Sequence, residues 1–262
     1  MLDALSPQRR RLILGAVGLA LLLIIALAVT AVVRVAAKSL HAIPQAEPGP
    51  VLLVPGYGGN VQSLQPLVAA LRSAGRTAVI VEPVGDGTGD LRIQAQHLGD
   101  VADRVRKDTR AASVDVVGYS AGGVVARLWV RDDGGDELAR RVLTLGSPHH
   151  GTTQAALGAE FAGGCPEACE QLVPDSDLLR RLNAGDETPA GPLWATIRST
   201  SDQVVTPVDS AALSGALNIE VQDICPRSTA AHGELPSNPV VSAALSSVLG
   251  VGAPQAPTNV HC

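Results

Sequence analysis

Beyond residue 50, short apolar runs alternate with segments in which apolar residues recur every three or four positions. The runs predict buried strands, and the wider spacing predicts helices with one apolar face. Strands are expected at 51–54, 78–81, 114–117, 142–145, 194–199 and 218–224. Helices are expected at 61–74, from Asp90 onward, at 123–131 and at 238–249. This alternation is typical of an α/β domain, a mostly parallel sheet with helices on both faces.

A different pattern precedes that domain. The run from Leu12 to Val33 is 22 residues long, almost entirely apolar, and follows the arginines at 9–11. Such a run is long enough to cross a bilayer, so we predict one N-terminal transmembrane helix, an uncleaved signal anchor. Because arginines prefer the cytoplasmic side, the rest of the chain would be extracytoplasmic. A signal peptide cleaved near 35–37, giving a secreted protein, and a buried helix are the alternatives.

The predicted organisation has three parts. Residues 1–38 form a cytoplasmic stub with the transmembrane anchor or signal peptide, residues 39–50 form a proline-containing linker, and residues 51–262 form one α/β domain. The net charge of −5, with no basic cluster beyond residue 50, argues against nucleic acid as a partner. With only five aromatic residues (two Trp, two Tyr and one Phe), the core must be aliphatic.

The most informative stretch lies at 113–127, where a β-branched run leads directly into Gly118-Tyr119-Ser120-Ala121-Gly122. A strand, a sharp turn and a helix with serine at the apex predict a strained nucleophile elbow, which lifts the serine hydroxyl above the sheet. The motif alone is weak evidence in a chain with 27 glycines, and a plain glycine-rich turn is the alternative. The flanking strand and helix favour Ser120 as a nucleophile.

A serine nucleophile needs a histidine base and a carboxylate that orients it. In the sheet fold that carries this elbow, the chain order is serine, acid, histidine. His232, after the last predicted strand, fits that order, whereas a surface histidine is the alternative. Asp202, three residues after the strand 194–199, is our candidate for the acid. The rivals for these two roles are Asp209, Asp175, Asp177, His149, His150 and His261.

Acyl transfer also needs N–H donors for the oxyanion of the tetrahedral intermediate. The residue after the nucleophile, Ala121, supplies one backbone N–H, and the loop after the first strand supplies the second. Within that loop, 55–59, we choose the backbone N–H of Tyr57. A phosphate-binding turn is the alternative, but the loop lacks both the spaced glycines and the Lys-Ser/Thr of such motifs.

Five motifs in this order resemble one known family. They are Val54-Pro-Gly-Tyr-Gly-Gly, Val117-Gly-Tyr-Ser-Ala-Gly-Gly-Val-Val-Ala-Arg, Leu145-Gly-Ser-Pro-His-His-Gly-Thr, Ser201-Asp-Gln-Val-Val-Thr-Pro and Ala231-His-Gly-Glu-Leu-Pro. Across residues 50–249 the chain resembles the bacterial class 2 lipases and esterases, which are small α/β-hydrolases. The resemblance implies carboxylic-ester hydrolysis with Ser120, Asp202 and His232 as the triad. Pro55 departs from the pattern, because many lipases have histidine there.

The four cysteines, Cys165, Cys169, Cys225 and Cys262, fit an oxidising compartment and allow three pairings. We favour Cys165 with Cys169 and Cys225 with Cys262, the second of which would close a loop containing His232. A metal site built from Cys165, Cys169 and the adjacent histidines is the alternative, although the spacing matches no common zinc pattern. We expect neither a metal nor a cofactor.

The strand and helix alternation lapses from Gly146 to Gly191, which is too long for a simple connection in a compact domain. In a hydrolase this segment would wall or cover the acyl pocket; an ordinary surface excursion is the alternative.

The sequence therefore predicts a serine ester hydrolase that acts on lipid or small acyl esters, tethered to a membrane through its N-terminal helix or secreted. An acyltransferase or thioesterase with the same triad, and an inactive hydrolase fold that serves as a binding module, are the alternatives. The three filled triad positions count against the last of these.

Overall fold

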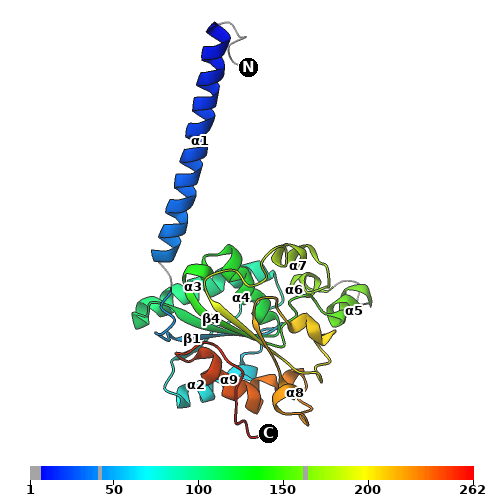
Figure 1. Ribbon diagram of the computed structural model, residues 1–262. Coiled ribbons are helices and arrows are strands. Elements are labelled where there is room, and N and C mark those ends of the chain that lie inside the picture. The colour runs from blue at the N-terminus through cyan, green and yellow to red at the C-terminus, as the bar shows by residue number, and fades with distance from the viewer. Residues whose placement is uncertain (1–6, 41–42, 162–164) are drawn as a thin grey trace. The chain divides into compact units, whose positions relative to one another are not determined.

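The computed structural model describes residues 7–40, 43–161 and 165–262 (Figure 1). The chain divides into two compact units, Met1–Ala42 and Ile43–Cys262. The described part of the first unit is a single helix, α1 (Pro7–Leu40). Across the described ranges, no helix combines the length and apolar character needed to cross a membrane. The transmembrane anchor predicted within residues 1–38 is therefore not supported.

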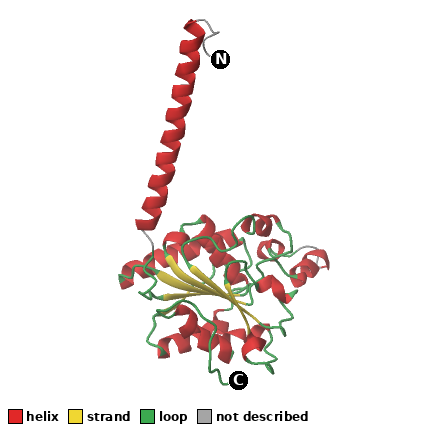
Figure 2. Ribbon diagram, in the orientation of Figure 1, coloured by secondary structure: helices red, strands yellow, loops and turns green. Residues whose placement is uncertain are grey.

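The second unit is built on a six-stranded sheet in which every neighbouring pair is parallel (Figure 2). The strand order is β2-β1-β3-β4-β5-β6. The strands are β1 (Val51–Val54), β2 (Ala78–Ile80), β3 (Val114–Tyr119), β4 (Ala139–Leu145), β5 (Leu193–Arg198) and β6 (Leu217–Glu220). Because all strands run the same way, the loops that follow them gather at one edge of the sheet. We call this the carboxyl edge.

Helices cover both faces of this sheet (Figure 1). One face packs against α3 (Leu91–Thr109) and α4 (Ala121–Asp132), and the other against α2 (Gln65–Ser73) and α9 (Pro239–Leu249). Each helix turns an apolar stripe inward; in α3 the stripe consists of Leu91, Ala95, Leu98, Val101, Ala102 and Val105. The buried side chains are mainly aliphatic, as predicted, with Trp129 as the largest exception.

The remaining helices are short. Single-turn or two-turn 3₁₀ segments lie at η2 (Val61–Leu64), η3 (Gly135–Glu137), η4 (Val208–Ala211) and η5 (His232–Ser237). Short α-helices lie at α5 (Thr153–Phe161), α6 (Glu167–Gln171), α7 (Asp177–Leu182) and α8 (Val221–Ile224). Three of these, α5 to α7, fall within 146–191, where the sequence showed no regular pattern, because helices of five to nine residues give too few turns for a clear period.

The strand predicted at 218–224 is too long. Strand β6 ends at Glu220, and the chain then turns into α8 at Val221. Strand β6 lies at the edge of the described sheet, next to β5, and the last residue of β5 that pairs with it, Arg198, lies opposite Glu220. Beyond that point the backbone has no neighbouring strand, so its hydrogen bonds are made within a helical turn instead.

Candidate active site

Ser120 lies at the sharp turn between β3 and α4 and has a left-handed backbone, with φ 52° and ψ −126°. A non-glycine residue adopts this region only under strain, which the close packing of the turn maintains. A Cβ on Gly118 would lie 2.6 Å from the carbonyl oxygen of Gly122, and one on Gly122 would lie 2.3 Å from that of Val54. Both glycines are therefore required by backbone contacts, as expected for a nucleophile elbow.

Three side chains from three different loops form one hydrogen-bonded chain at the carboxyl edge. Nε2 of His232 lies 3.0 Å from Oγ of Ser120, and Nδ1 of His232 lies 2.7 Å from Oδ2 of Asp202. The serine follows β3, the aspartate follows β5, and the histidine begins η5. Asp202 and His232 are buried, at 5% and 8% exposure. The structure thus brings together the three residues that the sequence singled out.

The second oxygen of the Asp202 carboxylate is also satisfied. Oδ1 accepts hydrogen bonds from the backbone N–H groups of Val204 and Val205, at 2.8 and 2.9 Å. These donors fix the carboxylate plane and leave Oδ2 free to face the imidazole. A carboxylate held in this way can orient His232 and stabilise its protonated form.

The rival acids and histidines lie elsewhere. Asp209 is exposed and lies 3.6 Å from the guanidinium of Arg198, and Asp177 pairs with Arg180 on α7. Asp175 occupies a turn with a positive φ of 58°. The imidazole of His150 lies 2.8 Å from Glu187, and His261 is exposed near the C-terminus.

The candidate oxyanion donors lie beside Ser120. Ala121 is the first residue of α4, and the first N–H groups of a helix have no acceptor within it. The loop after β1 passes close to Ser120, since a Cβ on Gly56 would lie 2.9 Å from the Cβ of the serine. Tyr57, the residue that we selected for its backbone N–H, follows in that loop and is half-exposed.

Comparison with known families identifies this arrangement. The family model described as "Lipase (class 2)" matches residues 95–242, more than half of the chain. The chain belongs to the class 2 lipase family. The matched range contains Ser120, Asp202 and His232.

Several solved structures share the fold of this chain. Aspergillus fumigatus lipase B superposes with a TM-score of 0.71 at 22% identity, over 79% of this chain and 54% of that one. The mature form of Bacillus licheniformis lipase BlEst2 superposes with a TM-score of 0.63 at 16% identity, over 78% of this chain and 93% of that one. A Listeria innocua protein superposes with a TM-score of 0.53 at 15% identity, over 75% of this chain and 91% of that one. The chain thus spans about half the length of the A. fumigatus lipase.

Tyr119, to which the sequence assigned no role, supports His232. Its hydroxyl donates to the backbone carbonyl of His232 at 3.2 Å, and the two ring centroids are 5.2 Å apart. Burial, with a smaller contribution from the nearby Asp202 carboxylate, raises the pKa of Tyr119 to about 12. The phenol is therefore a constant donor at neutral pH. The sequence feature that could have indicated this role is the position of Tyr119 inside the elbow motif, directly before Ser120.

A second unpredicted contact joins the loops of the acid and the histidine. The Ser199 hydroxyl donates to the carbonyl of Ala230 at 2.6 Å and accepts from the Gln222 side-chain amide at 3.0 Å. The same Gln222 amide donates to the carbonyl of Ser228 at 3.0 Å. These contacts hold the chain just before Asp202 against the chain just before His232.

His149, one of the rival histidines, follows β4 and has a different environment from His232. It is completely buried, and its Nε2 lies 3.0 Å from the Thr144 hydroxyl. Burial first, and then the positive charges of Arg127 and His150, hold the pKa of His149 well below its ordinary value. The imidazole is therefore neutral at pH 7 and belongs to the core.

Arg127, on α4, is buried, and none of the described carboxylates is hydrogen-bonded to its guanidinium. It donates instead to the carbonyls of Glu187 and Leu182 and to the side-chain oxygen of Asn183. Burial lowers its pKa to about 10, so it stays charged at neutral pH. These bonds attach α4 to the last residue of α7 and to the chain that follows it.

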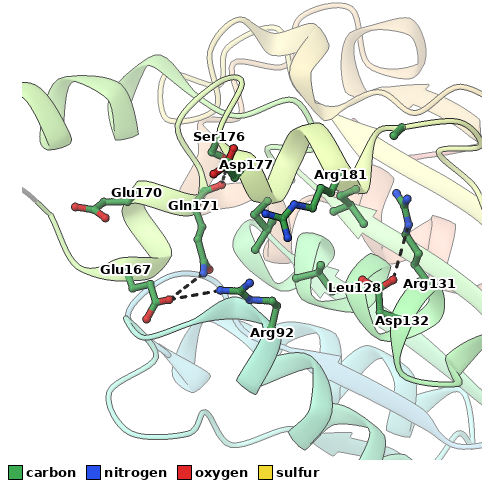
Figure 3. Close-up of a pocket in the computed structure, with 13 residues that line it drawn as sticks. Arg92, Leu128, Arg131, Asp132, Glu167, Glu170, Gln171, Ser176, Asp177 and Arg181 are labelled. Atoms are coloured by element: carbon green, nitrogen blue, oxygen red, sulfur yellow. Dashed lines mark hydrogen bonds and ion pairs between the residues drawn. The ribbon is translucent and has the colours of Figure 1, made fainter.

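A pocket of about 640 Å³ lies away from the triad, between α3 and α4 on one side and α6 and α7 on the other (Figure 3). Arg92, Leu128, Arg131 and Arg181 are among its lining residues, and Arg92 pairs with Glu167 across it. Its lining includes no residue of the triad or of the candidate oxyanion hole. Helices α6 and α7 therefore border this pocket, and a role for 146–191 in covering an acyl pocket remains a prediction.

Both disulfides are present in the structure, between Cys165 and Cys169 and between Cys225 and Cys262. The first lies at the start of α6, and the second attaches the C-terminal residue to the end of α8. The cysteines that could have served a metal site are thus oxidised. In the parts of the chain that the structure describes, no group of three or more metal-binding side chains is found.

Proposed function

We propose that this class 2 lipase family member is a carboxylic-ester hydrolase with Ser120 as its nucleophile. The observation that carries the proposal is the continuous hydrogen-bonded chain from Ser120 through His232 to Asp202. His232 would remove the hydroxyl proton as Ser120 attacks the ester carbonyl, and would then return that proton to the departing alcohol. The resulting acyl-enzyme would be hydrolysed by water, which His232 activates in the same way.

The backbone N–H groups of Ala121 and Tyr57 are the proposed donors to the oxyanion of the tetrahedral intermediate. Two features support this role: the position of Ala121 at the start of α4, and the contact of the Gly56 backbone with Ser120. Donors fixed before the reaction stabilise charge that develops only in the transition state. Because the donors are backbone groups, Pro55 does not interfere.

We propose lipid or small acyl esters as substrates and an extracytoplasmic location for the domain. Two disulfides support that location, because such bonds form and persist in oxidising compartments. The pocket between α4 and α7 is not proposed as the acyl site, since it begins about 12 Å along α4 from Ser120, the length of eight helical residues.

The decisive experiment is Ser120→Ala, assayed on p-nitrophenyl esters from acetate to palmitate. We expect kcat to fall by about 10⁴–10⁶-fold while the thermal unfolding transition is retained. Ser246→Ala, which removes an exposed hydroxyl on α9, is the matched control and should leave turnover unchanged. Unchanged turnover in Ser120→Ala would refute the proposed function. The chain-length series identifies the preferred acyl group.

A further inference from the structure

The chain that follows β4 runs beside the loop that carries Asp202. Residues 152–154 hydrogen-bond to residues 203–206 of that loop, although the two stretches are about fifty positions apart in sequence. The Thr153 N–H donates to the carbonyl of Thr206 at 2.9 Å, and the side-chain amide of Gln154 donates to the carbonyl of Gln203 at 3.2 Å. The acid loop is therefore held along its length by a neighbouring segment.

Thr152 makes the contact closest to the acid itself. Its side chain is buried, at 5% exposure, and its hydroxyl donates to the carbonyl of Val204 at 2.5 Å. The same hydroxyl accepts a hydrogen bond from the Thr206 N–H at 3.2 Å. Meanwhile the N–H of Val204 donates to Oδ1 of Asp202 at 2.8 Å. Val204 is thus bonded on one side to the proposed catalytic carboxylate and on the other to Thr152.

We propose that Thr152 is a positioning residue for the Asp202 carboxylate. By fixing the Val204 carbonyl, the Thr152 hydroxyl sets the direction of the Val205 N–H in the same peptide unit, and this amide binds Oδ1 together with the Val204 N–H. Those amides in turn hold Oδ2 at its 2.7 Å contact with His232. The hydroxyl is well suited to this role, because it is at once a donor to one backbone group of the loop and an acceptor from another.

Thr152 also connects the acid loop to the segment 146–191. Its backbone N–H donates to the carbonyl of Leu172 at 3.0 Å, at the end of α6. Helix α6 is held in turn by the disulfide between Cys165 and Cys169 and by Gln171, whose side chain accepts from the Leu91 N–H of α3 at 2.8 Å. Thr152 therefore links the loop that carries Asp202 to helix α6, which contributes no residue to the triad.

The test is the nearly isosteric substitution Thr152→Val, which removes the hydroxyl and keeps the volume. Because small displacements of catalytic groups have large effects on rate, we expect kcat to fall by about 10-fold or more. KM should change by less than about 2-fold, since Thr152 is not proposed to touch the substrate. Thr152→Ser, which keeps the hydroxyl, should restore most of the lost kcat.

A second measurement separates positioning from general stability. In an Asp202→Asn background the carboxylate is already absent, so adding Thr152→Val should cause little further loss of kcat. Thr196→Val is the matched control: it removes another buried threonine hydroxyl, which donates to Asn218 on β6 and contacts no part of the triad. Its kcat per folded molecule should equal that of the unsubstituted protein.

Three results would overturn the proposal: unchanged kcat in Thr152→Val, an equal loss in Thr196→Val, or a full additional loss in the Asp202→Asn background. If Thr152→Val does not fold, Thr152→Ala carries the same comparisons. The role of Thr152 rests on the proposed function, and different results would refute each of them. Activity retained by Ser120→Ala refutes the function, whereas an inactive Ser120→Ala together with a fully active Thr152→Val refutes only the role of Thr152.

Discussion

A buried carboxylate lies near each end of β3, and the two have different partners. At the carboxyl edge, just beyond the strand, Ser120 adjoins the His232 imidazole and the Asp202 carboxylate. Near the other end, about 16 Å away for five residues of strand, lies Asp115. Asp115 is completely buried, and both of its oxygens are bonded to arginines: Arg140 at 2.6 and 2.9 Å and Arg76 at 2.6 Å.

The difference lies in the partners. Asp115 faces two guanidinium groups that are always charged, and these also bind backbone carbonyls at the end of α9, including that of Leu249. Asp202 faces a single imidazole, that of His232, which takes up and releases a proton in the proposed reaction. A buried carboxylate bonded to several guanidinium groups joins elements of the fold, whereas one bonded to the proposed general base can assist proton transfer. We therefore expect substitutions at the two ends to affect different quantities.

The largest effect is expected for Asp202→Asn. An amide cannot stabilise the protonated imidazole and favours the wrong tautomer, so kcat on a p-nitrophenyl ester should fall by about 10⁴-fold. The unfolding transition should change little, since asparagine keeps the shape and can still accept from Val204 and Val205. A kcat within 10-fold of the original would remove Asp202 from the triad and end the contrast between the two carboxylates.

Asp115→Asn is the counterpart at the other end of the strand. Removing the carboxylate leaves the buried guanidinium of Arg140 without its ion-pair partner, so the free energy of unfolding should fall by about 3–5 kcal/mol. Activity per folded molecule should persist below the transition. Urea unfolding together with an ester assay measures both quantities. If Asp115→Asn lowered kcat and left the free energy of unfolding unchanged, the contrast between a structural Asp115 and a catalytic Asp202 would be wrong.

Much of this molecule could be predicted from sequence because its signals are local. The elbow at 118–122 and the apolar stripe of α3 each depend on residues close along the chain. The chain order of serine, acid and histidine then pointed to three side chains that the structure brings within hydrogen-bonding distance. Strand β4 was recognised only in part, because Arg140 and Arg141 interrupt the apolar run at its start although both are buried.

What could not be predicted depends on how distant segments meet. The bonds from Tyr119 to His232 and from Thr152 to Val204 join residues more than fifty positions apart, and no pattern of apolar residues encodes them. The arginine cluster around Asp115 depends in the same way on the register of β3 against β4. Helix α8 was missed because the end of β6 is fixed by its neighbour β5 and not by its own composition.

His149 offers a test of a third buried group, one that burial keeps neutral. Because its pKa is lowered in the folded state, the unfolded chain takes up the proton more readily as the pH falls below about 6.5. Stability should therefore decrease on acidification through this window, by up to about 1.4 kcal/mol per pH unit from this group. His149→Gln should show a correspondingly flatter decline in urea unfolding between pH 6.5 and 5. An identical decline in both proteins would contradict the assignment of His149 as a neutral core residue.

Tyr119→Phe should have the smallest effect. It tests whether the neutral Tyr119 hydroxyl, at the carboxyl edge, contributes to catalysis. The substitution keeps the ring against His232 and removes only the hydrogen bond to its carbonyl, which is worth about 0.5–1.5 kcal/mol. If the whole of that energy positions the imidazole, kcat should fall by about 2- to 10-fold with KM unchanged. Since the pKa of Tyr119 is about 12, the hydroxyl stays protonated and the ratio of the two kcat values should be constant from pH 6 to 9. A loss of stability without any change in kcat would instead make Tyr119 a purely structural residue, and position at this edge would then depend on Asp202 and its loop alone.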